Sequence, residues 1–282
     1  MFSGLGKLTG EYSITLKDDA KPFCLYTPRK VAYPLVPQVR EEINKMLEMK
    51  VISRVTCPTE WTAGMVPVLK PNGKLCVCVD YTHLNKAVRR ETHPLHSVEE
   101  SLAKLGKSKW FTKLDSNSGF WQMPLAEDSR LLTTFICGEG RFCFNRVPMG
   151  LNSASEVFQR SMSLLLLGLD GVICHMDDIL IHAITQQEHD VLAQEVLTRL
   201  QAAGLTLNEK CVFSKNSISF LGHMIDEHGI HADPKKIRAI TTFAAPKTIT
   251  ELQRFLGMTN QLGKFVPNLA HTTKPLRDLL KK

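Results

Sequence analysis

The 282-residue sequence lacks the features that mark several broad classes of protein. Its leucine-rich run LLLLGL, at 164–169, meets Asp170 long before it could span a bilayer, and no charged and then apolar leader opens the chain. There is no internal repeat and no low-complexity linker, which argues against a solenoid or a disordered chain. We therefore expect a soluble, intracellular protein with no secretion signal and no membrane partner.

Paired cysteine motifs are also absent. The eight cysteines are scattered among mostly apolar neighbours, and none shows the C-x-x-C spacing of a zinc site. Cys76 and Cys78 would share one side of a strand, but no second ligand pair lies near them in the sequence. We expect free thiols, mostly buried, in a reducing compartment rather than disulfides or a zinc centre.

The composition is that of a folded protein with a basic surface. Hydrophobic residues make up 43% of the chain and charged residues 22%, and the length suffices for two or three subdomains around a sizeable core. Lys and Arg number 35 against 28 Asp and Glu, so the net charge is +7 and the pI about 9.0. This balance favours a polyanionic partner without establishing one.

Hydrophobic periodicity predicts α and β segments mixed along most of the chain. A strand is expected in the alternating segment 10–23, and hairpins at 65–81, where Asn72-Gly73 gives the turn, and at 132–147. A single strand ends at Asp115, a β pair covers 211–230, and the last sixty residues are helical. The segment 38–52 forms a helix that places Val39, Ile43, Met46 and Leu47 on one face.

Capping signals mark the starts of further helices. Ser or Thr stands three residues before Glu at four places, and Asp233-Pro234 is typical of an N-cap followed by the first helical residue. The four pairs are Ser97 with Glu100, Ser153 with Glu156, Thr185 with Glu188, and Thr248 with Glu251.

The segment ICHMDDILIH, at 173–182, places Asp177 and Asp178 between two β-branched runs. The simplest interpretation is a solvated hairpin turn, because Asp favours turns. The apolar runs on both sides nevertheless indicate central strands, and Asp115 ends another strand, so three carboxylates could converge. Three carboxylates repel one another unless cations neutralise them, and Mg²⁺ prefers oxygen ligands. Two such ions about 3.5–4 Å apart serve phosphoryl transfer.

Six motifs occur in an order and spacing that resemble a known family. They are KPNGKLCVCVDYTHLN, FTKLDSNSGFWQMPL, TTFICGEGRFCFNRVPMGLNSA, MDDIL, FLGHMIDEHGI and ELQRFLGMTNQLGKF. From about Gly4 onward the chain resembles the reverse transcriptase region of Ty3/gypsy-type retrotransposon polyproteins. The resemblance implies an α+β fold, a polymerase right hand with fingers, a palm of antiparallel sheet packed on helices, and a partial helical thumb or connection.

The resemblance also implies a division of the chain. Residues 1–36 would be an N-terminal linker or extended segment, and residues 37–109, with parts of 126–150, the fingers. Residues 110–205 would form the palm that carries the aspartates, and residues 206–282 the palm-to-thumb hairpin and the helical thumb or connection. Neither the protease nor the ribonuclease H domain of full-length relatives is recognised here, so we expect a fragment of a polyprotein, located in the cytoplasm or a virus-like particle.

The implied activity is RNA-directed DNA polymerase, with dNTP and an RNA or DNA template-primer as partners. Asp115, Asp177 and Asp178 match the catalytic aspartates that hold two Mg²⁺ ions, with Mn²⁺ as a possible substitute. Five further positions match nucleotide-binding residues: Lys70, Cys76, Phe120, Gln122 and Gly150. Of these, Gln122 and Gly150 would contact the nucleotide or the template. His175 and Met176 match template-primer positions.

Simpler interpretations stand beside two of these roles. Phe120 matches an aromatic residue under the nucleotide sugar that would exclude a 2′-hydroxyl, and it would serve equally well as a core residue. Lys70 matches a triphosphate contact, and without the family it would be a solvated turn residue.

The chain departs from the family pattern at supporting positions. Cys76 replaces an Arg, whose guanidinium would fork onto phosphate oxygens, and His175 replaces a Tyr. Met149 replaces an aromatic residue, and Ala154-Ser155 replaces Ala-Pro. The alternatives to an active polymerase are therefore a weakened enzyme, an inert nucleic-acid-binding remnant or host-adopted module, and a soluble α/β protein with no nucleic-acid role. The sequence leaves dimerisation open.

Overall fold

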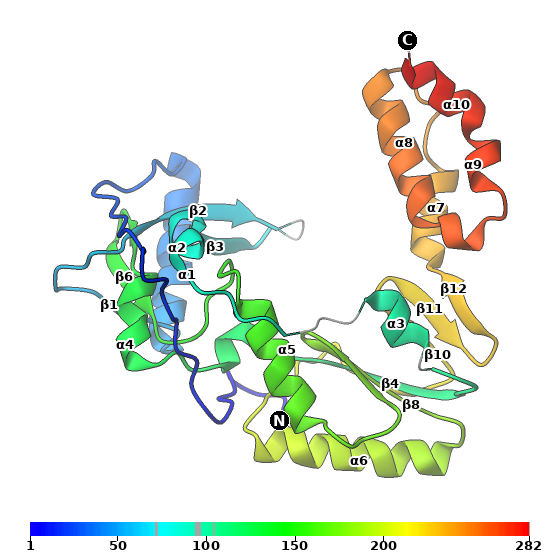
Figure 1. Cartoon of the computed structure of the whole chain (residues 1–282), viewed down its shortest axis with the longest axis horizontal. Coiled ribbons are helices and arrows are strands. Elements are labelled where there is room, and N and C mark those ends of the chain that lie inside the picture. Colours follow the sequence, from blue (N-terminus) through cyan, green and yellow to red (C-terminus); the bar gives the residue numbers. More distant parts are fainter. Residues whose placement is uncertain (71–72, 94–96, 104, 282) are drawn as a thin grey trace.

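Three β-sheets and the helices around them make up the computed structural model, which describes residues 1–70, 73–93, 97–103 and 105–281 (Figure 1). The first sheet has the order β1-β6-β5-β2-β3, with β2 and β5 parallel and the other neighbours antiparallel. Its strands are β1 (Ile52–Arg54), β2 (Ala63–Leu69), β3 (Leu75–Asp80), β5 (Phe135–Cys137) and β6 (Gly140–Phe144).

Helix α1 (Val36–Glu48) packs against this sheet. It buries Val39, Ile43 and Met46, as its periodicity predicts, while Leu47 is only partly buried. The predicted hairpins β2–β3 and β5–β6 are confirmed. Asn72 of the first hairpin lies outside the described residues.

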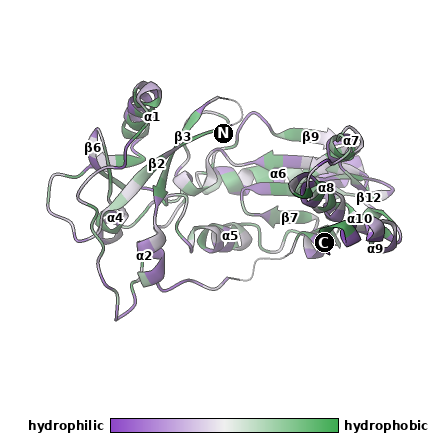
Figure 2. Cartoon of the chain, turned by 90° about the horizontal axis from the view of Figure 1, so that it is seen from above, coloured by the Kyte–Doolittle hydropathy of each residue, from purple (hydrophilic) through white to green (hydrophobic). Residues whose placement is uncertain are grey.

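The second sheet has four antiparallel strands in the order β7-β8-β4-β9. These are β4 (Trp110–Asp115), β7 (Val172–His175), β8 (Asp178–Ala183) and β9 (Val212–Lys215). Helices α5 (Ala154–Leu165) and α6 (Gln186–Ala202) pack on it, and Figure 2 shows hydrophobic residues along β7, next to α5.

Both faces of β8, a central strand of the second sheet, are buried. Along β8, Ile179 and Ile181 belong to the principal core with α5 and α6, whereas Leu180 faces a second core formed with α3 (Val98–Ala103) and the third sheet. All three side chains are fully buried. This two-sided burial explains why the strand is a continuous apolar run rather than an alternating one.

The third sheet consists of β10 (Ser217–Phe220), β11 (His223–Asp226) and β12 (Gly229–Ala232). The predicted β pair at 211–230 was therefore too simple, because β9 joins the second sheet and β12 adds a strand. The remaining helices follow β12 and stand apart from the first two sheets (Figure 1). They are α7 (Pro234–Thr241), α8 (Ile249–Gln261), α9 (Leu269–Thr272) and α10 (Lys274–Asp278).

Short helices connect these parts. The α-helices are α2 (Thr82–Ala87) and α4 (Glu127–Arg130), and the 3₁₀ helices are η1 (Tyr33–Leu35), η2 (Gly119–Gln122), η3 (Leu131–Thr133), η4 (Gly263–Phe265) and η5 (Leu279–Lys281). Within the described part of the chain, no helix is both long and apolar enough to cross a membrane.

The predicted strand at 10–23 was wrong. The segment makes only isolated bridges, such as Tyr12 with Leu125, and joins no sheet. Its alternation has another cause: Leu8, Tyr12 and Ile14 are buried in the principal core. This part of the N-terminal segment is therefore packed against the core.

Most capping predictions are confirmed. Thr185 and Glu188 form a complete capping box, Ser97 and Glu100 exchange both bonds, and Asp233 and Thr248 accept N–H groups at their helix starts. The Ser153–Glu156 box was wrong. Ser153 already has helical dihedrals and makes no cap bond, because the buried Glu156 carboxylate is held by Arg90 instead.

Candidate active site at the ends of β4 and the β7–β8 hairpin

The two adjacent aspartates lie at a tight turn that a side chain of α5 holds by hydrogen bonds. His175 pairs with Asp178 across the β7–β8 ladder, so Met176 and Asp177 form a two-residue connection. Met176 has a left-handed φ of 54°, and its N–H donates to Oε1 of Gln159 on α5 at 2.6 Å. The side-chain amide of Gln159 also donates, through Nε2, to the Cys174 carbonyl at 3.0 Å. One buried side chain therefore fixes the turn on both sides.

The third aspartate lies directly beside them. Asp115 is the last residue of β4 and pairs with Asp178, the first residue of β8. The Ser116 N–H then donates to the Asp177 carbonyl at 3.0 Å, which ties the turn to the end of β4. Asn208 holds Asp115 through its backbone N–H, at 3.0 Å from the Asp115 carbonyl, and through its side-chain amide. The predicted convergence of the three aspartates is confirmed.

The convergence has an electrostatic consequence. The pKa of Asp115 is raised above 3.8, first by burial and then by the charge of Asp178, with a smaller contribution from Asp177. Lys113, two residues earlier on β4, opposes this rise, and its Nζ lies 2.9 Å from Oδ1 of Asp178. The site therefore concentrates negative charge that one lysine offsets only in part.

The donor chemistry of this cluster fits a hard divalent cation. Three carboxylates offer the oxygen ligands that Mg²⁺ prefers, and a cation would relieve the repulsion that raises the pKa of Asp115. Among the described residues, however, no group of three or more His, Cys, Asp or Glu side chains is already arranged as a ligand set. Lys113 holds one oxygen of Asp178, so ligation by that oxygen requires Lys113 to withdraw.

Phe120 lies next to this cluster. A Cβ added to Gly119 would come within 3.3 Å of Cβ of Asp177 and 3.0 Å of the Phe158 ring, so the start of η2 touches the turn. Phe120 is half-buried and meets Phe158 edge-on, with ring centroids 5.6 Å apart. Its position is compatible with either interpretation, a residue under the sugar or a packing residue.

Gln122 does not have the environment of a nucleotide contact. Its side chain is fully buried, and its amide donates to the carbonyls of Asn117 and Thr206, both at 2.8 Å. Its Oε1 accepts the Thr206 N–H at 2.8 Å. Because every polar atom of the side chain is engaged within the protein, Gln122 links η2 to the chain after α6 rather than reaching a ligand.

Lys70, Cys76 and Gly150 lie outside the sheet that carries the aspartates. Lys70 follows β2, and its N–H donates to the Lys74 carbonyl at 2.9 Å across the hairpin. Cys76 is half-exposed on β3, and the buried face of that strand carries Leu75, Val77 and Val79 instead. Gly150 has a φ of +96°, and its carbonyl accepts a hydrogen bond from Asn85 at 2.8 Å.

The template-primer candidates flank the turn. His175 is half-buried at the end of β7, and Met176 is the strained turn residue described above. Sequence reasoning missed three supporting residues: Lys113, Gln159 and Asn208. Lys113 could have been found, because a residue two before Asp115 lies on the same side of a strand. Gln159 and Asn208 reach the site only through tertiary packing and carry no local signal.

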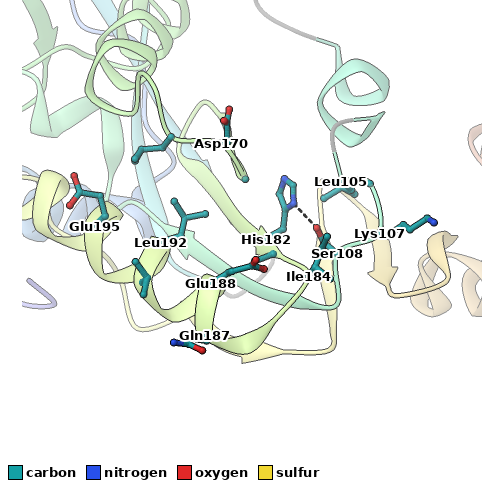
Figure 3. A pocket seen from close by; sticks show the side chains of 15 residues that line it. Leu105, Lys107, Ser108, Asp170, His182, Ile184, Gln187, Glu188, Leu192 and Glu195 are labelled. Atoms are coloured by element: carbon teal, nitrogen blue, oxygen red, sulfur yellow. Dashed lines mark hydrogen bonds between the residues drawn. The ribbon is translucent and has the colours of Figure 1, made fainter.

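A sizeable cavity lies elsewhere, at the opposite end of β8 from the aspartates. It measures about 830 Å³ and is lined by residues of α6 and by Leu105, Ser108 and His182, among others (Figure 3). His182 Nδ1 and Ser108 Oγ are 2.8 Å apart, and burial lowers the pKa of His182 to about 4. This histidine is therefore neutral at physiological pH, and it lines this cavity rather than the site of the aspartates.

The fold and the site together define a nucleic-acid polymerase palm, in which a tight hairpin and a neighbouring strand of an antiparallel sheet present three carboxylates. The model of the family "Reverse transcriptase (RNA-dependent DNA polymerase)" matches residues 68–225, more than half of the chain. The chain belongs to the reverse transcriptase family, and the predicted kinship with retrotransposon enzymes is confirmed.

Curated relatives are retrotransposon polyproteins. The chain is 36% identical over 248 residues to the "Retrovirus-related Pol polyprotein from transposon 297" of Drosophila melanogaster, which covers 87% of this chain and 23% of that protein. It is 35% identical over 257 residues to the "Transposon Tf2-3 polyprotein" of Schizosaccharomyces pombe, covering 89% and 19%. The chain thus spans about a fifth to a quarter of the length of these relatives.

Solved structures give the same fold. A foamy viral protease-reverse transcriptase in complex with dsDNA matches with a TM-score of 0.89 and 26% identity, covering 99% of this chain and 58% of that one. The same enzyme in complex with an RNA/DNA hybrid matches with a TM-score of 0.87 and 25% identity, covering 98% and 37%. The predicted α+β polymerase fold is confirmed.

Proposed function

We propose that this chain is the polymerase part of a retrotransposon polyprotein and catalyses RNA-directed DNA synthesis. The reaction joins the primer 3′-oxygen to the α-phosphorus of a dNTP and releases pyrophosphate. The convergence of Asp115, Asp177 and Asp178 at one sheet edge carries the proposal, because that cluster suits phosphoryl transfer. Family membership supports it.

The three aspartates would hold two Mg²⁺ ions, or Mn²⁺ in their place. When bound, such ions lower the pKa of the attacking hydroxyl and stabilise charge on the leaving oxygens. The protein's own contribution is orientation: Gln159 holds the turn, and Asn208 holds Asp115. Lys113 balances the charge of Asp178 before the cluster is loaded.

The incoming dNTP would lie between the palm and the β2–β3 hairpin. Phe120 would pack under the sugar and exclude a 2′-hydroxyl, and Lys70 would contact the triphosphate as a point charge. Cys76 occupies the nearby position and cannot offer the forked donors of an Arg. Gly150 would allow close approach of backbone to the nucleotide or template.

The template-primer would cross the palm near His175 and Met176. We assign residues 37–109, with parts of 126–150, to the fingers and residues 110–205 to the palm. Residues 206–282 would form the palm-to-thumb hairpin and the helical thumb or connection, and residues 1–36 the N-terminal linker or extended segment. Support comes from the net charge of +7 and from structural neighbours that hold dsDNA or an RNA/DNA hybrid.

Primer extension on an RNA template tests the assignment. Wild type should extend a DNA primer only with Mg²⁺ or Mn²⁺, and Asp177→Asn or Asp115→Asn should reduce the rate by roughly a thousandfold or more, equivalent to about 4 kcal/mol. Asp19→Asn, which removes an exposed carboxylate elsewhere, is the matched control and should keep wild-type activity. Comparable incorporation by wild type and both site variants would remove the catalytic role.

The second candidate is an inert nucleic-acid-binding remnant. Cys76 favours it, since the position lacks the guanidinium that the family uses. The same assay separates the two: a remnant would bind the template-primer but show no metal-dependent extension in the wild-type protein.

A further inference from the structure

A second charged site lies on the first sheet, away from the aspartates. It is a cavity of about 520 Å³ lined by residues of the N-terminal segment, β1, α4 and the chain just after β6. Five cations and one carboxylate line it. They are Lys7, Lys50, Arg54, Arg130, Arg146 and Glu11, and we call this the basic cavity.

The cations of the basic cavity are not neutralised within the protein. Among residues 1–70, 73–93, 97–103 and 105–281, none of the five forms an ion pair with a carboxylate. With Glu11 as the one acidic side chain of the lining, a surplus of four positive charges surrounds one space. Like charges gathered in this way repel one another unless an anion lies between them.

Arg146 makes the imbalance costly. Its guanidinium is half-buried, and burial lowers its pKa, although an arginine stays charged. Its Nη1 makes only two long hydrogen bonds, at 3.4 Å to the Gly6 carbonyl and 3.3 Å to the Gln122 carbonyl. Charges removed from water are normally paired, and this half-buried cation has two carbonyl acceptors but forms no ion pair with a carboxylate among the described residues.

The walls of the cavity are held in place by their own bonds. Asn145 donates through Nδ2 to Ser53 Oγ at 2.7 Å, and its N–H donates to the Val51 carbonyl at 2.8 Å. Arg130 donates through Nε to the Leu125 carbonyl at 3.2 Å, and the Arg54 guanidinium lies 5.1 Å from the centre of the Phe142 ring. The guanidinium groups are therefore positioned by contacts that leave further N–H donors for a ligand.

The lining selects a class of ligand. It contains no aromatic residue on which a base could stack, and its three guanidinium groups match the geometry of phosphate oxygens. Its volume is that of a small-molecule site rather than an extended groove. We propose that the basic cavity binds a compact polyphosphate anion, either inorganic or the phosphate chain of a free nucleotide, independently of the aspartates and of divalent metal.

Calorimetric titration of the purified full chain with tripolyphosphate in EDTA tests this. We expect one site per chain, and the double variant Lys50→Gln/Arg54→Gln should weaken binding by about 10- to 100-fold. Lys21→Gln/Lys30→Gln removes two exposed cations elsewhere, so it lowers the net charge equally and should leave the affinity within about twofold. Lys70→Gln and Asp177→Asn should also bind normally, which separates this site from the proposed triphosphate contact and from the proposed catalytic aspartates.

Arg146→Lys adds a test of geometry, because it keeps the charge but loses the fork, and it should weaken binding by about tenfold. Thermal melting checks that the Arg146→Lys protein still folds. If it does not, the binding data of the exposed double variant Lys50→Gln/Arg54→Gln test the proposal. Replacing tripolyphosphate by ATP distinguishes the sources, since equal affinities mean that only the phosphates are read.

Three results would overturn the proposal. The first is no binding by wild type, and the second is an equal loss in the control double variant, which would indicate general charge attraction. The third is a cavity variant that loses affinity for a template-primer but not for tripolyphosphate, which would make the basic cavity a nucleic-acid contact.

Discussion

At the scale of single residues, the carboxylate cluster lowers the stability of the fold, and the proposed chemistry needs the charges that cause this loss. The folded-state pKa of Asp115 lies above 3.8, so the ionised side chain is less stable in the folded protein than in the unfolded chain. This penalty is fully present above the folded pKa and is lost as the pH falls through that pKa toward 3.8. A residue that is unfavourable for folding yet retained in a structured site is typical of function.

Asp115→Asn should therefore stabilise the protein while inactivating it. The substituted side-chain amide keeps an oxygen that can accept from Asn208 and removes the charge that Asp178 opposes. We expect the melting temperature to rise by only roughly 1–3 °C at pH 7, because solvent screens this partly exposed charge. The difference should shrink when melting is repeated toward pH 4. Asp19→Asn, far from the cluster, should show no such gain, and an unchanged or lower melting temperature for Asp115→Asn at pH 7 would contradict the electrostatic account.

Cys76 offers a second test at this scale. The side chain lies on the half-exposed face of β3, opposite Val68, so a longer residue can extend toward solvent without entering the core. Cys76→Arg should fold with a melting temperature close to wild type. If the position faces the triphosphate, the restored guanidinium should improve dNTP use by tens-fold or more, at about 1.5–3 kcal/mol per charge-assisted bond.

Steady-state extension at varied dNTP concentration measures this gain. Val68→Arg, which adds the same group to the neighbouring strand, is the matched control. A stable Cys76→Arg protein with no advantage over that control would refute the phosphate-contact role.

At the scale of elements, short sequence patterns predicted those structures that depend on interactions between residues close together in the chain. Hairpins, the amphipathic face of α1 and three of the four Ser or Thr caps followed from short patterns. Ser153 failed because a tertiary ion pair with Arg90 takes Glu156 away from the cap. The strand expected at 10–23 failed because alternation reports burial of every second residue, and it does not supply a neighbouring strand for pairing.

The N-terminal segment shows how packing between distant elements supports the site. Lys7 donates its N–H to the Gly204 carbonyl at 2.9 Å, and Leu8 donates to the Gln122 carbonyl at 2.8 Å. A Cβ on Gly6 would come within 2.6 Å of the Gly204 carbonyl oxygen and 2.8 Å of the Thr206 backbone nitrogen. Only glycine permits this approach.

Gly6→Ala should destabilise the fold by about 1–3 kcal/mol, as overpacking does. It should also lower the polymerase rate, because Gln122 and Thr206 shift together and the end of β4 follows them. Urea unfolding gives the first quantity and primer extension the second. Gly138→Ala, where an added Cβ meets nothing within 4 Å, should leave both near wild type. Equal free energies of unfolding for the two variants would mean that the N-terminal segment can shift to accommodate the added methyl group without loss of stability.

At the scale of the whole molecule, the sequence indicated the site but not its support. Asp115, Asp177 and Asp178 were identifiable because strand ends and a turn can be read from a few residues. The partners that hold them, Gln159 from α5 and Asn208 after α6, lie far away in the sequence and meet the aspartates only when the sheet and helices pack. The basic cavity likewise brings together residues between positions 7 and 146, and the net charge did not show where its cations would meet.

The whole chain should bind a template-primer through its charge, separately from catalysis. Lys and Arg contacts to phosphates release counterions, so the logarithm of the affinity falls linearly with the logarithm of the salt concentration. With about six phosphate contacts, affinity should drop roughly a thousandfold between 50 and 200 mM salt. Fluorescence anisotropy with a labelled RNA–DNA hybrid measures this slope, and Asp177→Asn should show the same slope as wild type, because the carboxylate contacts no phosphate when divalent metal is absent. An affinity that does not change with salt concentration would contradict binding by a basic surface. A salt dependence that disappears only in Asp177→Asn would mean that binding of the template-primer depends on the catalytic aspartates.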